Sequence, residues 1–348
     1  LYMRDEDVAE WAEAKWILPL DKMPGAAGLD KDEYGFVHEQ THYKGQRFGT
    51  IYYVGPQVHM YNQEHFKQGG VKQPAETYTE LREIGLTLKR QGVVEFPMWG
   101  TPSEGLLEVA YLASGKRFFD PQLNPHFGDD PLFREIVDWH YTAYAGDRIF
   151  GRQEGVQDAF ANGLSTFAWS SFYALKQRNG YSLGGRGEKA GAAAGQLMNA
   201  VNPSFVNGKT GTLSVVRQYA VAAHSQHPQE AWRLINFLGG KDKQGQYYTA
   251  KRWWLLAGLG YGYKPLVNDA DIKADTAKWG DLAAYHKVML ASHPRPGIAG
   301  PWSTLWRKEF RAVIKEVMQG KIAVLDGIGQ AVTIWNTMRD EFRRTHGQ

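Results

Sequence analysis

The residue types that stand out in this sequence are aromatic side chains that also carry a polar group. The chain contains 12 Trp and 18 Tyr and no Cys. Tyr and Trp present flat apolar faces with a polar edge, which suits contacts to sugar rings as well as packing in a core or an interface. The lack of Cys excludes disulfides, thiolate metal sites and a Cys nucleophile. The composition therefore favours stacking on a ligand, with core packing as the alternative role of each ring.

Acid–base catalysis is a second chemistry that can be considered. Hydrolysis of a glycosidic bond needs two carboxyl groups flanking that bond, and Glu95 and Glu104 are the pair that the sequence offers. Gly180 to Gly195 is rich in Gly and Ala, but it lacks the Gly-Lys-Ser ending of a phosphate-binding loop and is interpreted as a loop. A glycoside-processing enzyme is thus the weaker hypothesis.

Length and charge limit the remaining classes of protein. A chain of 348 residues forms two domains or one large one. The net charge of +3 is small, and Lys and Arg are scattered rather than gathered in a stripe, so we expect no nucleic-acid partner. The sequence has no run of 18 or more apolar residues that would predict a membrane span.

Two neighbouring segments are the most informative about the elements that position side chains. Gly55 to Phe66 is an extended apolar run, and Lys72 to Arg90 begins with a Pro-containing linker. In the second segment Thr77 precedes Glu80 by three residues, which is the spacing of a capping box at a helix N-terminus. The sequence therefore predicts a strand followed by a helix that ends near Gly92.

Strands and helices alternate along the rest of the chain, without internal repeats. This alternation predicts an α/β fold. Helices are expected at 7–17, 104–113, 131–144, 228–238, 302–319 and 322–344, and strands at 47–54, 93–98, 164–173 and 212–223.

The order of these elements resembles that of the extracellular solute-binding proteins of ABC transporters, in particular the carbohydrate-binding group. Phe160 to Tyr173 resembles the family's Phe-x-x-Gly run and the ligand-contacting segment after it, with Leu164 and Phe167 in place of the usual Lys and Met. Thr212 to Leu238, Pro294 to Ala331 and the helix before Leu18-Pro19-Leu20 also match in order. The resemblance covers nearly the whole chain.

The resemblance implies a two-lobed, type II periplasmic-binding-protein fold with the ligand cleft between lobes joined by three crossing strands. We expect one lobe from 1–54 and 222–298, and the other from 55–221 and 299–348. The implied function is binding of a carbohydrate or related polyhydroxylated solute by hinge closure, without catalysis or cofactor. The implied partners are the solute and the permease subunits of an ABC importer, and the implied state is a periplasmic monomer.

The family begins with a strand, a helix and a second strand, about 60 residues in all, before the element that resembles the opening helix here. That first strand–helix–strand is apparently absent from this chain, and we expect the sequence to be a fragment of a longer one. A signal peptide is not present in it, so localisation rests on the resemblance.

Placement on the family pattern gives the candidate ligand-binding residues. Trp99 is the candidate for stacking, while an Arg217 that faces the cleft would favour an anionic ligand. Glu104 either binds a sugar diol or complements the dipole of the helix that it begins. Gly55 and His59 lie on the first crossing, and His59 fits a core position better. The full set is Tyr2, Gln57, Trp99, Glu104, Ser171, Tyr173, Arg217, Trp302 and Trp306.

Two alternatives keep the same fold and change the ligand. Ferric-binding proteins of similar architecture use adjacent tyrosines, and Tyr52-Tyr53 and Tyr247-Tyr248 are such pairs. Polyamine or another small-solute binding is the other alternative. Trp253-Trp254 is a further aromatic pair, and because neighbours on a strand point to opposite faces, one of the two is expected to pack in the core.

Overall fold

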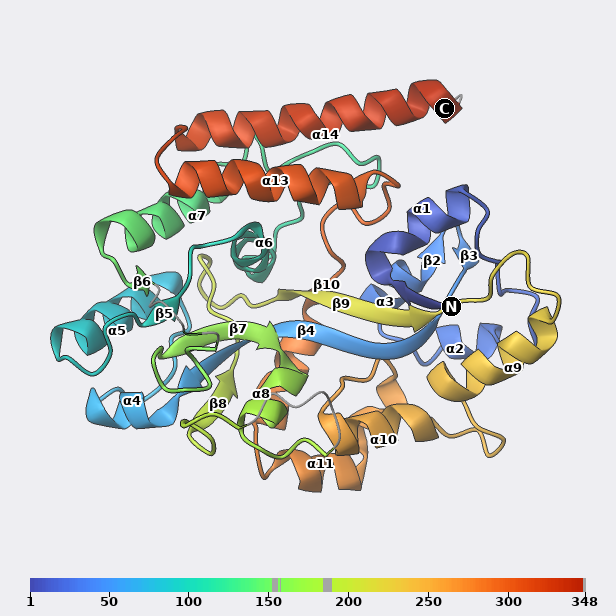
Figure 1. Ribbon diagram of the computed structural model, residues 1–348, viewed down its shortest axis with the longest axis horizontal. Helices are drawn as coiled ribbons and strands as arrows, with labels where there is room; N and C mark the ends of the chain where they lie inside the picture. Colours follow the sequence, from blue (N-terminus) through green and yellow to red (C-terminus); the bar gives the residue numbers. More distant parts are fainter. Residues whose placement is uncertain (152–155, 157, 184–189, 347–348) are drawn as a thin grey trace.

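A central mixed sheet with helices on both faces forms the framework of the protein. The computed structural model describes residues 1–151, 156, 158–183 and 190–346. Figure 1 shows the two longest strands, β4 and β9, running across the middle, with α6, α7, α13 and α14 on one side and α8, α10 and α11 on the other. This arrangement confirms the predicted α/β class.

The large sheet has the order β1-β9-β4-β7-β5-β6, with β10 pairing with β9 and β8 pairing with β4. Its long strands pair antiparallel, whereas β5 pairs parallel with β6 and β7. A separate ribbon joins β2 and β3. The strands are β1 (Tyr2–Arg4), β2 (His42–Tyr43), β3 (Gln46–Arg47), β4 (Thr50–Asn62), β5 (Met98–Trp99), β6 (Phe150–Gly151), β7 (Phe167–Ser171), β8 (Leu197–Ala200), β9 (Thr212–Tyr219) and β10 (Ser292–His293).

The helices cover both faces of this sheet and include two short 3-10 turns and one π turn, η1–η3. They are η1 (Asp5–Asp7), α1 (Val8–Glu13), α2 (Ala27–Asp30), α3 (Gly35–Thr41), α4 (Gln63–Gln68), α5 (Tyr78–Arg90), α6 (Glu104–Ala113), α7 (Pro131–Tyr141), η2 (Thr142–Gly146), α8 (Phe172–Arg178), α9 (Pro228–Gly239), α10 (Tyr248–Ala257), η3 (Lys264–Asn268), α11 (Ala270–Thr276), α12 (Leu282–Leu290), α13 (Ser303–Met318) and α14 (Val324–His346).

Several helix ends follow from local sequence chemistry. The Thr77 hydroxyl accepts a hydrogen bond from the Glu80 amide at 3.2 Å, and the Glu80 carboxylate accepts from the Thr77 amide at 3.0 Å. The predicted capping box is therefore confirmed, and α5 ends just before Gly92 as expected. Pro228 begins α9 and Pro131 begins α7, because Pro fits a first helical turn, where its missing N–H is not needed.

Other predicted elements differ from the structure. The sequence predicts no helix at Gly35–Thr41, where the structure has α3. The strand expected at 164–173 is limited to β7, because α8 begins at Phe172. The glycine-rich loop is described only in part, since 184–189 lie outside the described residues.

The long strand β4 contributes to two cores by alternation of its side chains. Val54, Val58 and Met60 point into one cluster of buried apolar residues, which is completed by α8, α10 and α12. On the opposite face, Tyr61 packs against a second cluster, built from α5, α6, α7, α13 and α14. A strand's neighbouring side chains point to opposite faces, so a single strand serves both cores.

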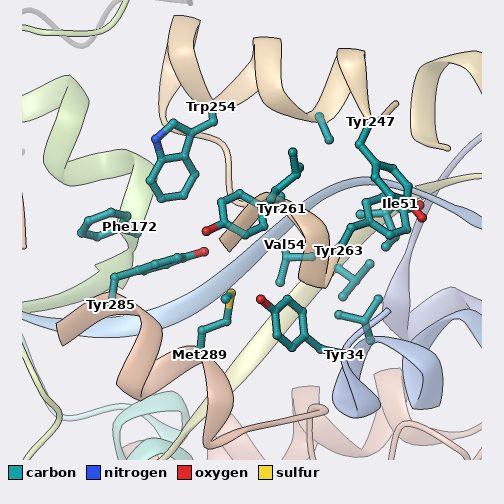
Figure 2. Close-up of a cluster of buried hydrophobic side chains, with 14 of the residues drawn as sticks. Tyr34, Ile51, Val54, Phe172, Tyr247, Trp254, Tyr261, Tyr263, Tyr285 and Met289 are labelled. Atoms are coloured by element: carbon teal, nitrogen blue, oxygen red, sulfur yellow. The ribbon is translucent and has the colours of Figure 1, made fainter. Parts of the chain in front are cut away.

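The first cluster is dominated by aromatic rings. Figure 2 shows Phe172, Trp254, Tyr261 and Tyr285 facing one another, although they come from different elements. Phe172 stacks on Tyr285 with ring centroids 4.4 Å apart, and Trp254 lies 5.3 Å from Tyr285. Phe172, Leu197 and other residues of the predicted second lobe belong to this first cluster. The lobe boundaries derived from the sequence stay a prediction.

Candidate ligand-binding site

Along β4 and β9, one face of the sheet is covered by core residues at one end and is accessible to solvent at the other. The accessible end defines the candidate site. Residues directly opposite on paired strands share a face. Tyr53 lies opposite Arg217, and Gln57 lies opposite Ser171, so these four side chains are on the same face as Gly55. The second core covers this face farther along β4, but Tyr53, Gln57 and Arg217 are only half-buried.

Aromatic side chains gather at the uncovered end of this face. Tyr52 is at the centre, with ring centroids 5.2 Å from Tyr53, 5.3 Å from Tyr219, 5.6 Å from Trp253 and 6.1 Å from Tyr2. A bulge in the pairing of β4 with β9 falls between Ile51 and Tyr53 and inserts Tyr52 as an extra residue. We call the following residues the tyrosine face: Tyr2, Tyr52, Tyr53, Tyr173, Tyr219 and Trp253.

The tyrosine face unites residues from distant parts of the sequence. Tyr173, in the first turn of α8, lies 5.9 Å from Tyr53, and Tyr2 is 53% exposed at the beginning of the chain. Partial burial raises the pKa of Tyr53 to about 12, so its phenol is neutral at physiological pH. Neutral phenols offer ring faces and hydroxyl groups, which is the chemistry needed to hold an uncharged polar ring.

Arg217 stands beside these rings, but its charge is balanced. Its Nη1 donates to Oδ1 of the buried Asp5 at 3.2 Å, and Arg295 lies 3.5 Å from the other oxygen of Asp5. Burial raises the pKa of Asp5, and Arg295 and Arg217 oppose that rise. Glu6 pairs with Arg4 at 2.9 Å and with Arg295 at 3.5 Å. The guanidinium therefore belongs to an internal ion-pair network and is not an unpaired positive charge.

Gln57 and Ser171 form a polar pair next to the aromatic rings. Gln57 Nε2 donates to Ser171 Oγ at 3.0 Å. Gly55 lies next to them, and a Cβ added there would be 2.7 Å from Ser171 Oγ and 3.0 Å from Val215 Cγ2. Glycine at this position therefore lets β4 and β7 come together closely enough for the Gln57–Ser171 contact.

A cavity of about 1030 Å³ lies on the other side of β7 and contains Trp99. Trp169 also lines it, two residues before Ser171, so β7 joins the cavity to the tyrosine face. Trp169 Nε1 and Ser165 Oγ are buried atoms without a hydrogen-bond partner in the described chain. The polar residues of the wall are Thr101, Ser103, Asp158, Asn162, Ser165 and Arg178.

His59 marks the end of the accessible face. Its ring is fully buried, lies 4.7 Å from the Trp169 ring, and has no hydrogen-bond partner within the described residues. Burial lowers the pKa of His59 to about 3, so the imidazole is neutral. This placement agrees with the core role that the sequence favoured for His59, which interrupts the accessible part of this face after Gln57.

The structure brings together six of the predicted site residues and not the other three. Tyr2, Tyr173 and Arg217 lie at the tyrosine face, Gln57 and Ser171 adjoin it, and Trp99 lines the cavity across β7. In this sense the family pattern locates side chains from five separate segments. Their roles in binding stay a prediction.

Glu104, Trp302 and Trp306 take up other positions. Glu104 is buried at the beginning of α6 and forms an ion pair with Arg311 at 2.7 Å. Trp306 has no exposed surface, and its Nε1 donates to the Ala331 carbonyl at 3.0 Å. The Trp302 ring packs on Trp335 at 5.3 Å. None of the three lines the cavity or contacts the tyrosine face, because α6 and α13 direct them into the second core.

The residues that the sequence did not single out as sugar contacts are Tyr52, Tyr53, Tyr219, Trp169 and Trp253. Tyr52 and Tyr53 were considered only as ferric ligands. The Trp253-Trp254 pair does divide as expected, because Trp254 is buried in the first core and Trp253 contacts Tyr52. The pair lies on a helix, α10, and not on a strand. The bulge in β4 that positions Tyr52 has no distinct sequence signal.

One short motif typical of hydrolases requires comment. Gly180-Tyr181-Ser182-Leu183-Gly184 has the Gly-x-Ser-x-Gly spacing. A nucleophile elbow places its Ser between a strand and a helix. Here the segment follows the helix α8, and Gly184 lies outside the described residues. The motif therefore lacks the strand that would make it an elbow.

Comparison with known proteins identifies the family. Residues 1–254 match the family described as bacterial extracellular solute-binding protein, and the chain belongs to this family. The resemblance found in the sequence is therefore confirmed, and the family is one of solute-binding proteins and not of enzymes. No curated protein sequence matches the chain. No helix in the described part of the chain is long and apolar enough to cross a membrane.

Solved structures of sugar-binding proteins share the fold. Maltose-bound MalE3 of T. maritima has a TM-score of 0.78 at 15% identity, covering 97% of this chain and 84% of that one. The sugar-binding protein MalE of Xanthomonas citri has a TM-score of 0.78 at 16% identity, with coverages of 100% and 85%. A solute-binding protein of Thermotoga lettingae with bound α-D-tagatose has a TM-score of 0.75 at 15% identity, with coverages of 97% and 84%. These likenesses confirm the fold of a periplasmic sugar-binding protein.

Proposed function

We propose that this protein binds a carbohydrate or a related polyhydroxylated solute and delivers it to the permease of an ABC importer. The observation that carries the proposal is the tyrosine face, where neutral rings from three strands and two helices lie beside an arginine whose charge is already paired. Rings stack on the apolar faces of a sugar, while Gln57, Ser171 and the phenols exchange hydrogen bonds with its hydroxyls.

The charge balance near the site favours an uncharged solute. Asp5, Glu6 and Asp7 face Arg4, Arg217 and Arg295 in one network of ion pairs. Because acids and bases are equal in number there, no charge is left over to attract a uronate or a polyamine. The acidic sugar that Arg217 suggested from the sequence alone is thus less well supported than a neutral one.

The proposed mechanism is closure of one lobe on the other around the solute. Closure is favoured only if the liganded closed form has contacts that the open form lacks. The tyrosine face and the Trp99 cavity lie on either side of β7, which allows a solute to contact both sets of residues. In the proposed setting the protein works as a monomer in the periplasm, where the closed form is recognised by the permease.

Related proteins support the choice of solute class. Structures with this fold have bound tagatose and maltose, and one from Agrobacterium vitis has bound D-mannitol. These ligands share several hydroxyl groups and carry no charge. The same chemistry fits the side chains gathered here.

A thermal-shift screen of the full-length protein tests the proposal. The panel contains neutral sugars, polyols, uronates, polyamines and ferric ion. A ligand at about 100 times its Kd adds roughly 2.7 kcal/mol to the stability, which raises the unfolding midpoint of a protein of this size by about 2 °C or more. A shift with neutral sugars or polyols supports the proposal. Shifts with only ferric ion or polyamines would retain the fold and reject the carbohydrate assignment.

A further inference from the structure

A cluster of metal-binding side chains lies on α2, α3, the loop between them and His42, which follows α3 as the first residue of β2. Asp30, Glu33, His38 and His42 each place one potential ligand atom within 4.8 Å of those of the other three, the one such group found in the described residues. The sequence from 38 to 42 is His-Glu-Gln-Thr-His, a pattern in which two His one helical turn apart bind zinc.

The distances between the potential ligands suit a tetrahedral ion. His42 Nε2 lies 3.4 Å from Asp30 Oδ1, and His38 Nδ1 lies 3.8 Å from the same oxygen. Zinc binds N and O ligands at about 2.0–2.1 Å, so two ligands of a tetrahedral site are roughly 3.4 Å apart. The two imidazole rings are already adjacent, with centroids 3.7 Å apart. Binding of both rings to one ion requires His38 to turn out of this stack, which its exposed side chain allows.

Hydrogen bonding orients His42 as a ligand. Its Nδ1 lies 2.9 Å from the His38 carbonyl and 2.9 Å from Thr41 Oγ1. The carbonyl can only accept, so Nδ1 carries the proton and donates it. Nε2 then carries a lone pair and lies near Asp30 Oδ1, an acceptor oxygen that also receives a hydrogen bond from Arg47 Nε at 3.1 Å. Two acceptors at 3.4 Å are stabilised by a cation between them.

The charges of Glu33, Asp30 and Arg47 also favour a cation at this position. Arg47 donates to Glu33 Oε2 at 2.7 Å and also pairs with Asp30, so the two carboxylates share one guanidinium. One negative charge is left over. Glu33 is 2% exposed, and its Oε1 has no hydrogen-bond partner among the described residues. Glu33 therefore holds Arg47, and Arg47 in turn holds Asp30 beside the two imidazoles.

We propose that His38, His42 and Asp30 form a binding site for a divalent transition-metal ion such as zinc, with Glu33 and Arg47 holding the carboxylate side in place. Two imidazoles and a carboxylate form a ligand set that binds zinc in preference to calcium or magnesium. Glu39, the second residue of the pattern, is directed to Arg117 at 3.6 Å and takes no part.

The site is separate from the proposed sugar-binding face. Gln218 Nε2 donates to the Gln40 carbonyl of α3 at 2.8 Å. Gln218 alternates with Arg217 along β9, so α3 lies on the face of the sheet opposite to the tyrosine face. Metal binding and sugar binding can therefore succeed or fail independently.

The test is a zinc titration of the untagged full-length protein after chelator treatment. We expect about one equivalent of Zn²⁺ to bind with micromolar or tighter Kd by calorimetry. His38→Gln and His42→Gln are each expected to weaken binding at least 10-fold. His126→Gln is the matched control, because exposed His126 also lies near a carboxylate, 3.7 Å from Asp120, but has no second His in that contact. It is expected to leave the zinc affinity unchanged.

Cobalt gives a second readout that does not depend on affinity. Co²⁺ in a tetrahedral site absorbs strongly in the visible range, and the chain has no Cys that could bind it elsewhere. The band is expected for the wild type and for His126→Gln, but not for His38→Gln, whose exposed side chain can be replaced without loss of folding. Zinc binding that His38→Gln leaves unchanged, or no micromolar binding by the wild type, would overturn the site.

Discussion

The first core and the tyrosine face use the same residue types for opposite purposes. In the core, Phe172, Trp254 and Tyr285 pack with ring centroids 4.4–5.7 Å apart and have at most 1% exposed surface. At the tyrosine face, the Tyr52 contacts are 5.2–6.1 Å long and the rings are half-buried or exposed. The two regions contain the same types of residue. They differ because helices cover the rings of the first core and leave those of the tyrosine face open.

The adjacent residues Trp253 and Trp254 give the sharpest form of this comparison. Trp254→Ala is expected to lower the free energy of unfolding by about 3–5 kcal/mol, because it leaves a cavity in the core and removes the hydrogen bond from Nε1 to Thr276 Oγ1. Urea unfolding measures this loss. Trp253→Ala, as the matched control, is expected to cost less than half as much. Equal losses would show that the two regions do not differ in packing.

His59 lies where the second core begins to cover the face of β4 that carries Tyr53 and Gln57, and the pH dependence of stability tests this burial. The folded pKa of His59 is about 3 and the unfolded value is about 6.5. Above pH 6.5 both states are neutral, whereas below it the unfolded state takes up the proton first. Stability is therefore lost as pH falls from 6.5 towards 3, by up to about 1.4 kcal/mol per pH unit.

Urea unfolding at pH 7 and pH 4.5 measures this dependence, which His59→Phe should reduce. His140, whose pKa burial lowers to about 4, adds a similar dependence that persists in the variant and acts as an internal reference. An unchanged pH dependence in His59→Phe would mean that the imidazole is solvated and that the open face extends beyond Gln57.

Substitutions at the site should affect binding and not stability. Trp99→Ala and Tyr173→Ala are each expected to weaken binding of the solute found in the screen by about 10-fold or more, which corresponds to roughly 1.4 kcal/mol. Calorimetry measures the affinity, and thermal unfolding without ligand checks the fold. Trp302→Ala is the control, since its ring packs on Trp335 away from the site. Unchanged affinity in both site variants would contradict the proposed placement of the solute.

The last expected effect, of similar size, is at Gly55, where β4 lies close to Ser171 of β7. A Cβ at this position meets Ser171 Oγ at 2.7 Å, so Gly55→Ala should cost about 1–2 kcal/mol through strain between β4 and β7. The double variant with Ser171→Ala should recover part of this loss, because the closest atom is removed. Chemical unfolding of Gly55→Ala, Ser171→Ala and the double variant measures the free energy of unfolding of each. If the losses of the two single variants add up in the double variant, the two residues are not in direct contact.

The sequence predicted local features and the family well. The capping box at Thr77, the Pro-led beginnings of α7 and α9 and the bounds of α6 depend on contacts within a few residues, so they are visible without the fold. The family pattern also located Tyr2, Gln57, Tyr173 and Arg217, which the structure brings together. The same pattern failed to show that Trp306 is fully buried, because a residue on α13 reveals its burial only when α14 packs against it.

The sequence by itself determined the alternation of strands and helices, the ends of several helices and the membership of a solute-binding family. The helix ends follow from short-range chemistry, and the family follows from the order of the elements. Only the tertiary structure decided which aromatic rings stay open, that Arg217 is neutralised by Asp5, and that Tyr52 joins the site through a bulge. The physical reason is that burial and ion pairing depend on residues more than 200 positions apart in the chain, such as Asp5 and Arg217.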